Sequence, residues 1–272
     1  MRISARIPVA AALTLMLASC LGCQKLKERD QLVKGINAFK AGRYETAIDF
    51  FQNAVKLDPD DSMAQLYLAT AYSYQVVPNL DTPENLKTAQ KALDGFDNVL
   101  KKDPNDLGAL RQEASIHRNI KQYDKAKADE QKVISLDNND AEANYTIGVI
   151  DWTIAYKNAT TLLGAAGLTD DGEGNAKMSK DTCAKIAAQN TPLVNEAMQY
   201  LNRAVEINPI YDDAMQYLNL NYRRKADLEC GNDAARKADL AQADQWVQKA
   251  TGARKANEAA KEKKLGGGIS MQ

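Results

Sequence analysis

The residues that could carry out chemistry are few in this 272-residue chain. A single histidine, His117, excludes a metal site built from several histidines and disfavours a Ser-His-Asp arrangement. The acidic stretch 170–175 offers carboxylates, but it lacks the alternating ligands and the closing glutamate of an EF-hand calcium loop. No glycine-rich phosphate loop is evident. We therefore expect no catalytic residues, no metal and no cofactor, and we expect 170–175 to form a solvated turn.

The N-terminus has the layout of a secretory signal. Two basic residues, Arg2 and Arg6, precede the apolar run Val9–Leu17. This run is too short to span a bilayer, and small residues follow it, as they do at a signal cleavage site. The sequence therefore predicts an exported protein.

The phrase Leu17-Ala18-Ser19-Cys20 comes directly after the apolar run. It resembles the lipobox of bacterial lipoproteins, in which the cysteine is acylated and becomes the first mature residue. The resemblance implies a signal peptide at 1–19, a lipid on Cys20 and an anchor linker at 20–27. A lipid on Cys23, or a plain cleaved signal with an incidental cysteine, remains an alternative. Leu21 rather than aspartate follows Cys20, which under the sorting rule of Gram-negative bacteria implies the outer membrane.

Composition favours helices and gives no sign of a nucleic-acid partner. The formal net charge is −1, so no bulk electrostatic attraction draws the chain to nucleic acid or to an anionic membrane. Prolines number only seven, while alanine, leucine, lysine, glutamate and glutamine recur throughout. These side chains lose little rotamer freedom on a helical backbone. We expect an all-α protein.

A short phrase recurs along the chain and marks an internal repeat. Between the third residues of successive phrases, the spacing is 45 residues (59 to 104), then 34 (104 to 138), then 71 (138 to 209). The longer gaps exceed 34 by 11 and by 37, which indicates one repeat length with insertions. The phrases are Leu57-Asp58-Pro59, Lys102-Asp103-Pro104, Leu136-Asp137-Asn138 and Ile207-Asn208-Pro209.

Small and large residues recur at matching places within the repeats. The small ones would let antiparallel helices approach closely, and the large ones would fill the space between neighbouring repeats. The small residues are Gly35, Ala69, Ala114 and Gly148, and the large ones are Phe51, Tyr72, Phe96 and Leu201.

This period and these positions resemble the tetratricopeptide-repeat (TPR) family over about 28–250. The resemblance implies an all-α TPR solenoid of about five helix pairs, with insertions in the second and fourth repeats. Departures from the family pattern are the missing tryptophan in the first helices and a weak third repeat, in which His117 takes the place of a packing tyrosine. The implied repeats are about 28–61, 62–106, 107–140, 141–211 and 212–250.

Both insertions would lie between the two helices of a repeat. The first is around 76–86 and the second is 158–191. Thr191-Pro192 is a credible N-cap and first turn, and it therefore predicts the start of the next helix. Residues 251–272, which include three consecutive glycines, are expected to form a flexible C-terminal tail.

The repeat register implied by the resemblance places Cys183 and Cys230 in the helix-to-helix connections of successive repeats, on one edge of the solenoid. An exported protein meets an oxidising compartment if it resides in a periplasm. We therefore expect a disulfide between them, with two free thiols as the alternative.

The resemblance also implies a concave groove lined by the first helix of each repeat. Aromatic and arginine side chains in it are typical of binding hot spots, although some could instead pack under the inserted loops. Leu32 and Ile36 occupy the places where chaperone-binding members carry a Lys and Asn clamp for a C-terminal carboxylate, so that function is disfavoured. The predicted groove residues are Leu32, Ile36, Phe39, Leu66, Tyr74, Arg111, Arg118, Tyr145, Trp152 and Arg223.

The function expected from these features is that of a binding scaffold and not of an enzyme. It would be lipid-anchored on the periplasmic face of the outer membrane and would bind a partner protein or an extended peptide. By resemblance, lipoproteins with such repeats serve outer-membrane protein assembly or pilus and envelope biogenesis. The alternative is a lipoprotein that binds a small ligand or an ion and uses 158–191 as a lid.

Overall fold

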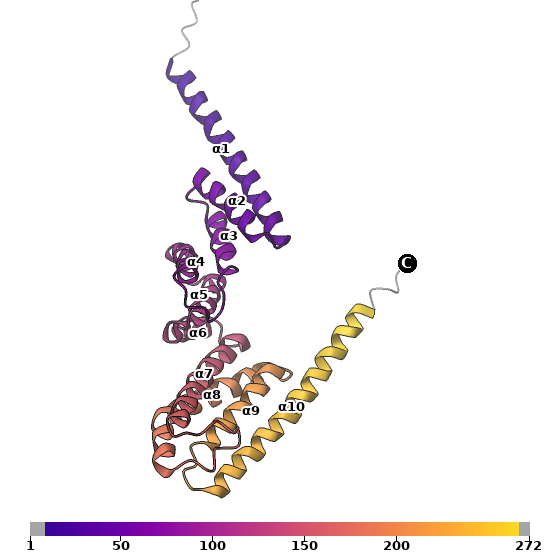
Figure 1. Ribbon diagram of the computed structural model, residues 1–272. Helices are drawn as coiled ribbons and strands as arrows, with labels where there is room; N and C mark the ends of the chain where they lie inside the picture. The colour runs from indigo at the N-terminus through magenta and orange to yellow at the C-terminus, as the bar shows by residue number, and fades with distance from the viewer. Residues whose placement is uncertain (1–8, 267–272) are drawn as a thin grey trace, which may run out of the picture. The chain divides into compact units, whose positions relative to one another are not determined.

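The computed structural model describes residues 9–266, and it describes side chains for residues 24–263 (Figure 1). Within these residues it contains ten α-helices and no β-strand. The helices are α1 Val9–Lys40, α2 Tyr44–Leu57, α3 Ser62–Ser73, α4 Pro83–Lys102, α5 Leu107–Asn119, α6 Tyr123–Leu136, α7 Ala141–Ala165, α8 Lys180–Ile207, α9 Asp212–Ala226 and α10 Asp233–Gly266. The chain divides into two compact units, Met1–Ala126 and Lys127–Gln272. The predicted all-α fold is confirmed.

In the first unit, α1 packs on α2, α2 on α3 and α3 on α4. The helices approach most closely at small residues. A Cβ added to Gly35 on α1 would lie 2.4 Å from Cε1 of Phe51 on α2. A Cβ on Gly95 of α4 would lie 2.6 Å from the Cβ of Ala69 on α3. Phe51 and Phe96 are fully buried. The predicted small residues Gly35 and Ala69 therefore lie at close contacts between helices, and these two large residues lie in the core.

In the second unit, α7 packs on α8, α8 on α9 and α9 on α10 (Figure 1). The same rule governs the packing of α7 on α8. A Cβ on Gly148 of α7 would lie only 2.5 Å from Cγ of Leu201 on α8. Contacts between α7 and α9 bring the first helices of two successive pairs together. This last contact positions the candidate site.

Aspartate side chains cap the helices that follow the first three recurring phrases, whereas Tyr211 at the start of α9, after the fourth phrase, makes no such bond. Asp61, Asp106 and Asp140 each lie two residues after the last residue of a phrase, and each accepts hydrogen bonds from backbone N–H groups in the first turn. The donors are Met63 and Ala64, Ala109, and Ala143 respectively. Each of these three phrases therefore ends one helix, and the aspartate two residues after it caps the start of the next.

The fourth-repeat insertion, predicted at 158–191, lengthens two helices and leaves a connection only at 166–179. The predicted helix start at Thr191-Pro192 is wrong. α8 begins after Ser179, whose side chain accepts the N–H of Thr182 and caps the helix, and Pro192 lies inside it. Proline removes the hydrogen bond to the carbonyl of residue 188, but Ala188 is exposed, so water can hydrate that carbonyl.

Over residues 251–266 the C-terminal end differs from the flexible tail predicted at 251–272, and residues 267–272 lie outside the described residues. α10 continues through 251–266. Two side chains tie this part back to the start of α9: Arg254 Nε donates to Asp212 Oδ2 at 2.9 Å, and Asn257 Nδ2 donates to Asp212 Oδ1 at 3.0 Å. The sequence pattern did not reveal these bonds.

At the other end, the predicted linker 20–27 is helical, because it lies within α1. The side chains of Cys20 and Cys23 lie outside the described residues, as do residues 1–8 of the predicted signal peptide. Among the described residues, none of the helices is both long and apolar enough to cross a membrane.

Candidate binding surface

Five aromatic side chains form a continuous row on and beside α7 and α9. Centroids of neighbouring rings are 5.1 to 5.6 Å apart, a spacing typical of interacting aromatic pairs. In spatial order this aromatic row consists of Tyr211, Tyr145, Tyr217, Trp152 and Tyr156.

Helical spacing explains why three members of the row lie together on α7. Tyr145, Trp152 and Tyr156 are separated by seven and then four residues on α7, which places them on one face of that helix. Tyr217 comes from α9 and meets the rings of both Tyr145 and Trp152 edge-on, at interplanar angles of 78° and 85°. Contact between the two helices therefore joins separate side chains into one surface.

The row is only partly covered. Tyr156 is 41% exposed, and the other four side chains are half-buried. Aromatic side chains with one face packed and another accessible offer rigid area for a ligand at little entropic cost. The row therefore has the properties of a binding surface rather than those of a closed core.

Polar groups fix both ends of the row. The Tyr211 hydroxyl donates a hydrogen bond to the Glu142 carboxylate. Burial, assisted by this bond, raises the pKa of Tyr211 well above its usual range, so the hydroxyl remains a donor at any physiological pH. At the other end, the Arg224 guanidinium lies 5.5 Å from the centroid of the Tyr156 ring, within range of a cation–π interaction.

Arg224 also holds the α7–α8 connection in place. Its side chain, 4% exposed, forms ion pairs with Asp170 and Asp227 at 2.9 Å each. Burial alone would raise the pKa of Asp170, but the Arg224 guanidinium holds it below its usual value. For Asp227, burial outweighs Arg224 and raises the pKa to about 6. Asn175 completes this cluster by donating to Asp227 Oδ1 at 2.8 Å.

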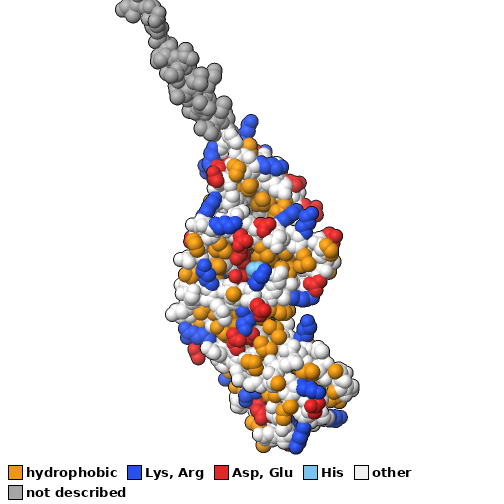
Figure 2. Space-filling view, turned by 90° about the vertical axis from the view of Figure 1, so that its left-hand side faces the viewer, with side chains coloured by type: hydrophobic (Ala, Val, Ile, Leu, Met, Phe, Trp, Pro, Cys, Tyr) orange, Lys and Arg blue, Asp and Glu red, His pale blue; other side chains and the backbone are white. Residues whose placement is uncertain are grey.

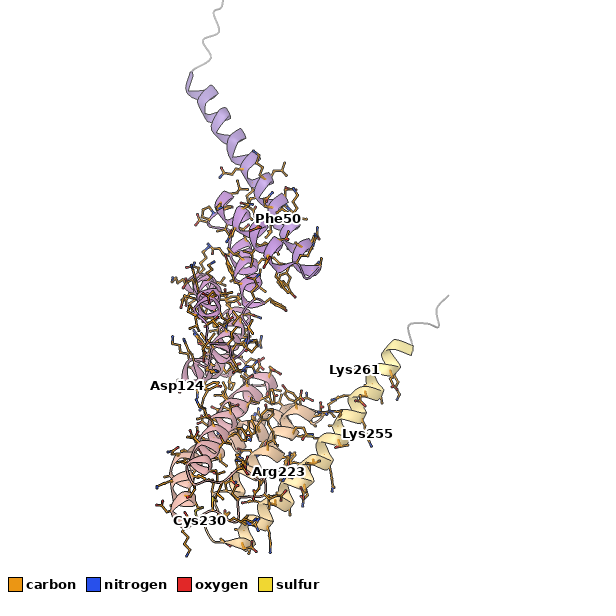
Figure 3. The ribbon with its side chains drawn as sticks, in the orientation of Figure 1. Phe50, Asp124, Arg223, Cys230, Lys255 and Lys261 are labelled. Atoms are coloured by element: carbon orange, nitrogen blue, oxygen red, sulfur yellow. A yellow bond between two sulfur atoms is a disulfide. The ribbon has the colours of Figure 1, made fainter. Side chains whose placement is uncertain are left out.

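Two further arginines form hydrogen bonds with the same α7–α8 connection. Arg223 on α9 donates to the carbonyl of Gly172 at 2.9 Å and pairs with Glu173 and Asp244 at 3.0 Å each (Figure 3). Arg236 at the start of α10 donates to the carbonyl of Glu173 at 2.6 Å. The predicted solvated turn at 170–175 is therefore only partly right. Asp171 and Glu173 are exposed, but Asp170 is paired with Arg224, and Gly174 and Asn175 are buried.

A disulfide closes the same end of the second unit. It joins Cys183 on α8 to Cys230 in the α9–α10 connection, with a Cα–Cα distance of 5.6 Å (Figure 3). This is the pairing that the repeat register implied. The disulfide fixes the start of α8, and with it one end of the 166–179 connection, to the last helix pair.

The structure places the predicted groove residues in different environments. Tyr145 and Trp152 belong to the aromatic row. Leu32 is 7% exposed, so its assignment to a groove is wrong; it packs in the core of the first unit. Arg223 is committed to the α7–α8 connection and is not a free groove residue.

The remaining predicted groove residues lie in the first unit. Ile36, Phe39 and Leu66 are half-buried and pack against the core. Tyr74 is 56% exposed, and its ring contacts those of Phe39 and Tyr44 at centroid distances of 5.0 and 5.2 Å. Arg111 and Arg118 both lie on α5.

Sequence reasoning missed Tyr156, Tyr211 and Tyr217. Tyr156 could have been found, because it lies one helical turn after Trp152. Tyr217 and Tyr211 join the row only through the packing of α9 on α7, which a repeat register accurate to a few residues does not fix.

Comparisons with known proteins agree with the fold. A family model described as "Tetratricopeptide repeat" matches residues 33–61 and 112–140. A curated protein of Schizosaccharomyces pombe, "DnaJ homolog subfamily C member 7 homolog", is 32% identical over 110 residues, which are 40% of this chain. The chain spans about a fifth, 21%, of the length of that relative.

Solved structures of MamA proteins have a similar fold. One crystal structure of MamA is 15% identical with a TM-score of 0.56, and the match covers 86% of this chain and 94% of that one. MamA from Desulfovibrio magneticus RS-1 is 17% identical with a TM-score of 0.55 over 85% and 96%. The family model thus shows that the chain contains tetratricopeptide repeats, and the helix pairs of the described residues and the similarity to MamA structures agree with that fold.

Proposed function

We propose that this protein is a scaffold that holds an extended segment of a partner protein along the aromatic row. The TPR fold supports a role in protein–protein interaction. The observation that carries the proposal is the partly exposed row of five aromatic rings on the first helices of two successive repeats.

The surroundings of the row indicate what it would bind. The charged groups at its two ends already have partners: Glu142 accepts from Tyr211, and Arg224 pairs with Asp170 and Asp227. The accessible surface between them is aromatic. Apolar side chains spaced along an extended peptide would bury against these rings. An acidic ligand would gain little there, because Arg224, the cation at one end of the row, is already paired with two aspartates.

Site-specific photo-crosslinking in the native host would test this function. A photoreactive amino acid at position 156 should capture a partner, and one at exposed Lys185 on α8 should not. Trp152→Ala should weaken the capture by about 1–3 kcal/mol, because a large anchor is lost. Equal capture from both positions would contradict the proposal. So would a loss of helical signal in Trp152→Ala, since the row would then be core.

We also propose that the protein is anchored through a lipid on Cys20. The lipobox-like phrase supports this, and each buried acyl methylene would contribute about 0.8 kcal/mol to membrane attachment. Labelled palmitate should enter the wild type and Cys23→Ala but not Cys20→Ala, which should be released in soluble form. Labelling that is lost only in Cys23→Ala would move the anchor to that residue.

The proposed location is the periplasmic face of the outer membrane, with Leu21 after the acylated cysteine as support. The proposed role is in outer-membrane protein assembly or in pilus and envelope biogenesis. Crosslinking of the acylated protein followed by isolation from membranes should recover components of one of these pathways. Recovery with inner-membrane proteins alone would contradict the proposed location.

The alternative, a small-ligand or ion-binding protein with 158–191 as a lid, receives less support from the geometry. A lid has to move between an open and a closed position. Hydrogen bonds and an ion pair from three arginines, together with the nearby disulfide, instead fix the 166–179 connection in place. The hollow of about 260 Å³ beside it is lined in part by Gly174, Cys183 and Arg236, which belong to these same ties. A thermal shift on addition of calcium or metabolites, abolished by changes in this connection, would favour the alternative.

A further inference from the structure

Three carboxylates meet in the first unit, away from the aromatic row. Glu28 lies on α1, Asp58 is the C-cap of α2, and Asp61 is the N-cap of α3. Each residue contributes one carboxylate oxygen to a group in which all the oxygens lie within 4.8 Å of one another. Because the α2–α3 turn is short and α1 packs on α2, residues about thirty positions apart come together here.

Glu28 is the unusual member of the group. Its side chain is only 2% exposed, and its Oε1 is buried with no hydrogen-bond partner among the described residues. A buried carboxylate oxygen without a partner is costly unless a proton or a cation compensates it. Burial and the nearby Asp61 raise the pKa of Glu28, which reflects the same unbalanced charge.

In both Asp58 and Asp61, the two carboxylate oxygens make different interactions. Oδ1 of Asp58 accepts the N–H of residue 60, and Oδ1 of Asp61 accepts the N–H groups of the first turn of α3. Their Oδ2 atoms instead face Lys25, whose Nζ lies 2.5 Å from Asp58 and 3.9 Å from Asp61. The oxygens that the turn does not use are therefore directed toward a cation.

Lys25 alone does not balance this cluster. Three ionised carboxylates and one ammonium leave a net charge of −2. The Lys25 side chain is 63% exposed, and ion pairs of such exposed groups contribute little stability, so a stronger cation can displace it. The opposing ligands of a calcium ion are separated by up to about 5 Å, twice its bond length to oxygen. The group thus fits one calcium coordination sphere, with water in the remaining positions.

We propose that Glu28, Asp58 and Asp61 bind a calcium ion in place of the Lys25 ammonium. The ion would tie α1 to the α2–α3 turn. The second repeat provides an internal comparison. Its turn has the same Asp-Pro-x-Asp sequence at 103–106, and its aspartates make the same capping bonds. At the start of its first helix, however, Ser62 takes the place of Glu28, and Lys102 Nζ contacts the Ser62 hydroxyl.

Calorimetric titration of the full-length protein with calcium tests this proposal, and thermal unfolding with calcium or with chelator gives a second readout. The wild type should bind one ion and gain thermal stability, because calcium would bind the folded state alone. Glu28→Gln and Asp58→Asn should each weaken binding at least about tenfold, since ligand charge sets the affinity. Lys25→Gln should strengthen it, and Asp103→Asn should leave it unchanged.

Two results would overturn the proposal. One is the absence of both heat and thermal shift in the wild type up to about 10 mM calcium, beyond the range of weak extracellular calcium modules. The other is a Glu28→Gln protein that is more stable than wild type at every calcium concentration, which would mean that a proton shared with Asp61 fills this place. Asp58→Asn keeps Glu28 intact, so it decides the matter if Glu28→Gln does not fold.

Discussion

At Gly148 the backbones of α7 and α8 approach so closely that a Cβ would lie 2.5 Å from Cγ of Leu201. Leu201 is fully buried, so it has no free space into which to move. Gly164 lies on the same helix α7, yet a Cβ there would meet nothing within 4 Å. A larger side chain would therefore clash at Gly148 but has open space at Gly164, although both glycines lie on one helix.

Gly148→Ala should accordingly destabilise the protein by about 1–3 kcal/mol, because overpacking outweighs the higher helix propensity of alanine. Gly164→Ala should stabilise it by up to about 1 kcal/mol, since only propensity changes. Urea unfolding of both variants measures the difference. A Gly148→Ala protein as stable as Gly164→Ala would show that α7 and α8 can separate at this point without cost.

The buried pair of Lys127 and Asp151 should give stability an unusual pH dependence. Asp151 is fully buried and lies 2.7 Å from Lys127 Nζ, which also pairs with Glu196 at 2.9 Å. Burial raises the pKa of Asp151 to about 6, despite Lys127. The folded state therefore binds the proton more tightly than the unfolded state, whose aspartates titrate near 3.9. This contribution to stability is complete below about pH 4 and is lost as the pH rises toward 6.

Asp151→Asn, which resembles the protonated acid, should flatten this part of the pH profile. At most about 3 kcal/mol is involved, from roughly two pKa units at about 1.4 kcal/mol each. The measurement is the free energy of unfolding between about pH 4 and pH 7, with Asp97→Asn as an exposed control. A variant that retains the wild-type slope would assign the effect to another group, such as Asp227.

At the scale of elements, the α7–α8 connection has two kinds of restraint. The disulfide closes a loop of 47 residues and would stabilise the protein by about 4 kcal/mol at most. The hydrogen bonds from Arg223, Arg224 and Arg236 act on the connection directly. Removing the covalent restraint should therefore reduce global stability more than it disturbs the connection.

The double variant Cys183→Ser, Cys230→Ser should unfold at a lower urea concentration than the wild type. Amide hydrogen exchange in 166–179 should remain slow, because the arginine contacts persist. The reduced wild type is the matched control for thiol chemistry. Rapid exchange throughout the connection in both proteins would show that the disulfide alone keeps it ordered.

Sequence reasoning predicted these elements correctly where the interactions that determine them lie within one repeat. The Asp-Pro phrases place the ends of second helices, and glycine opposite a large residue places close contacts, as with Gly35 and Phe51. It failed at Pro192, because a proline that is tolerated inside an exposed helix turn looks the same as one that starts a helix. It also did not reveal the arginine partners of 170–175, which lie some fifty residues away in sequence.

At the scale of the whole molecule, charge is balanced rather than concentrated. The formal net charge is −1, and charged side chains of both signs alternate with hydrophobic ones on the face seen in Figure 2. The candidate binding surface could be predicted only in part: two of the five residues of the aromatic row, Tyr145 and Trp152, follow from the repeat register. Tyr156 could have been added from its position one helical turn after Trp152, whereas Tyr211 and Tyr217 depend on the packing of helices from different repeats, which a repeat pattern does not give.

This balance leads to a prediction about partner binding. The aromatic row would hold its proposed ligand through burial of apolar area, and Arg224, the cation at its end, is already paired with aspartates. Screening shortens the reach of charges to a few ångströms at about 1 M salt, but it does not weaken apolar burial. Capture through position 156 should therefore change less than about twofold between low and high salt, while a charge-driven complex would lose far more. A steep fall of capture with salt would place the binding surface on charged side chains elsewhere, and Trp152→Ala would then bind as the wild type does.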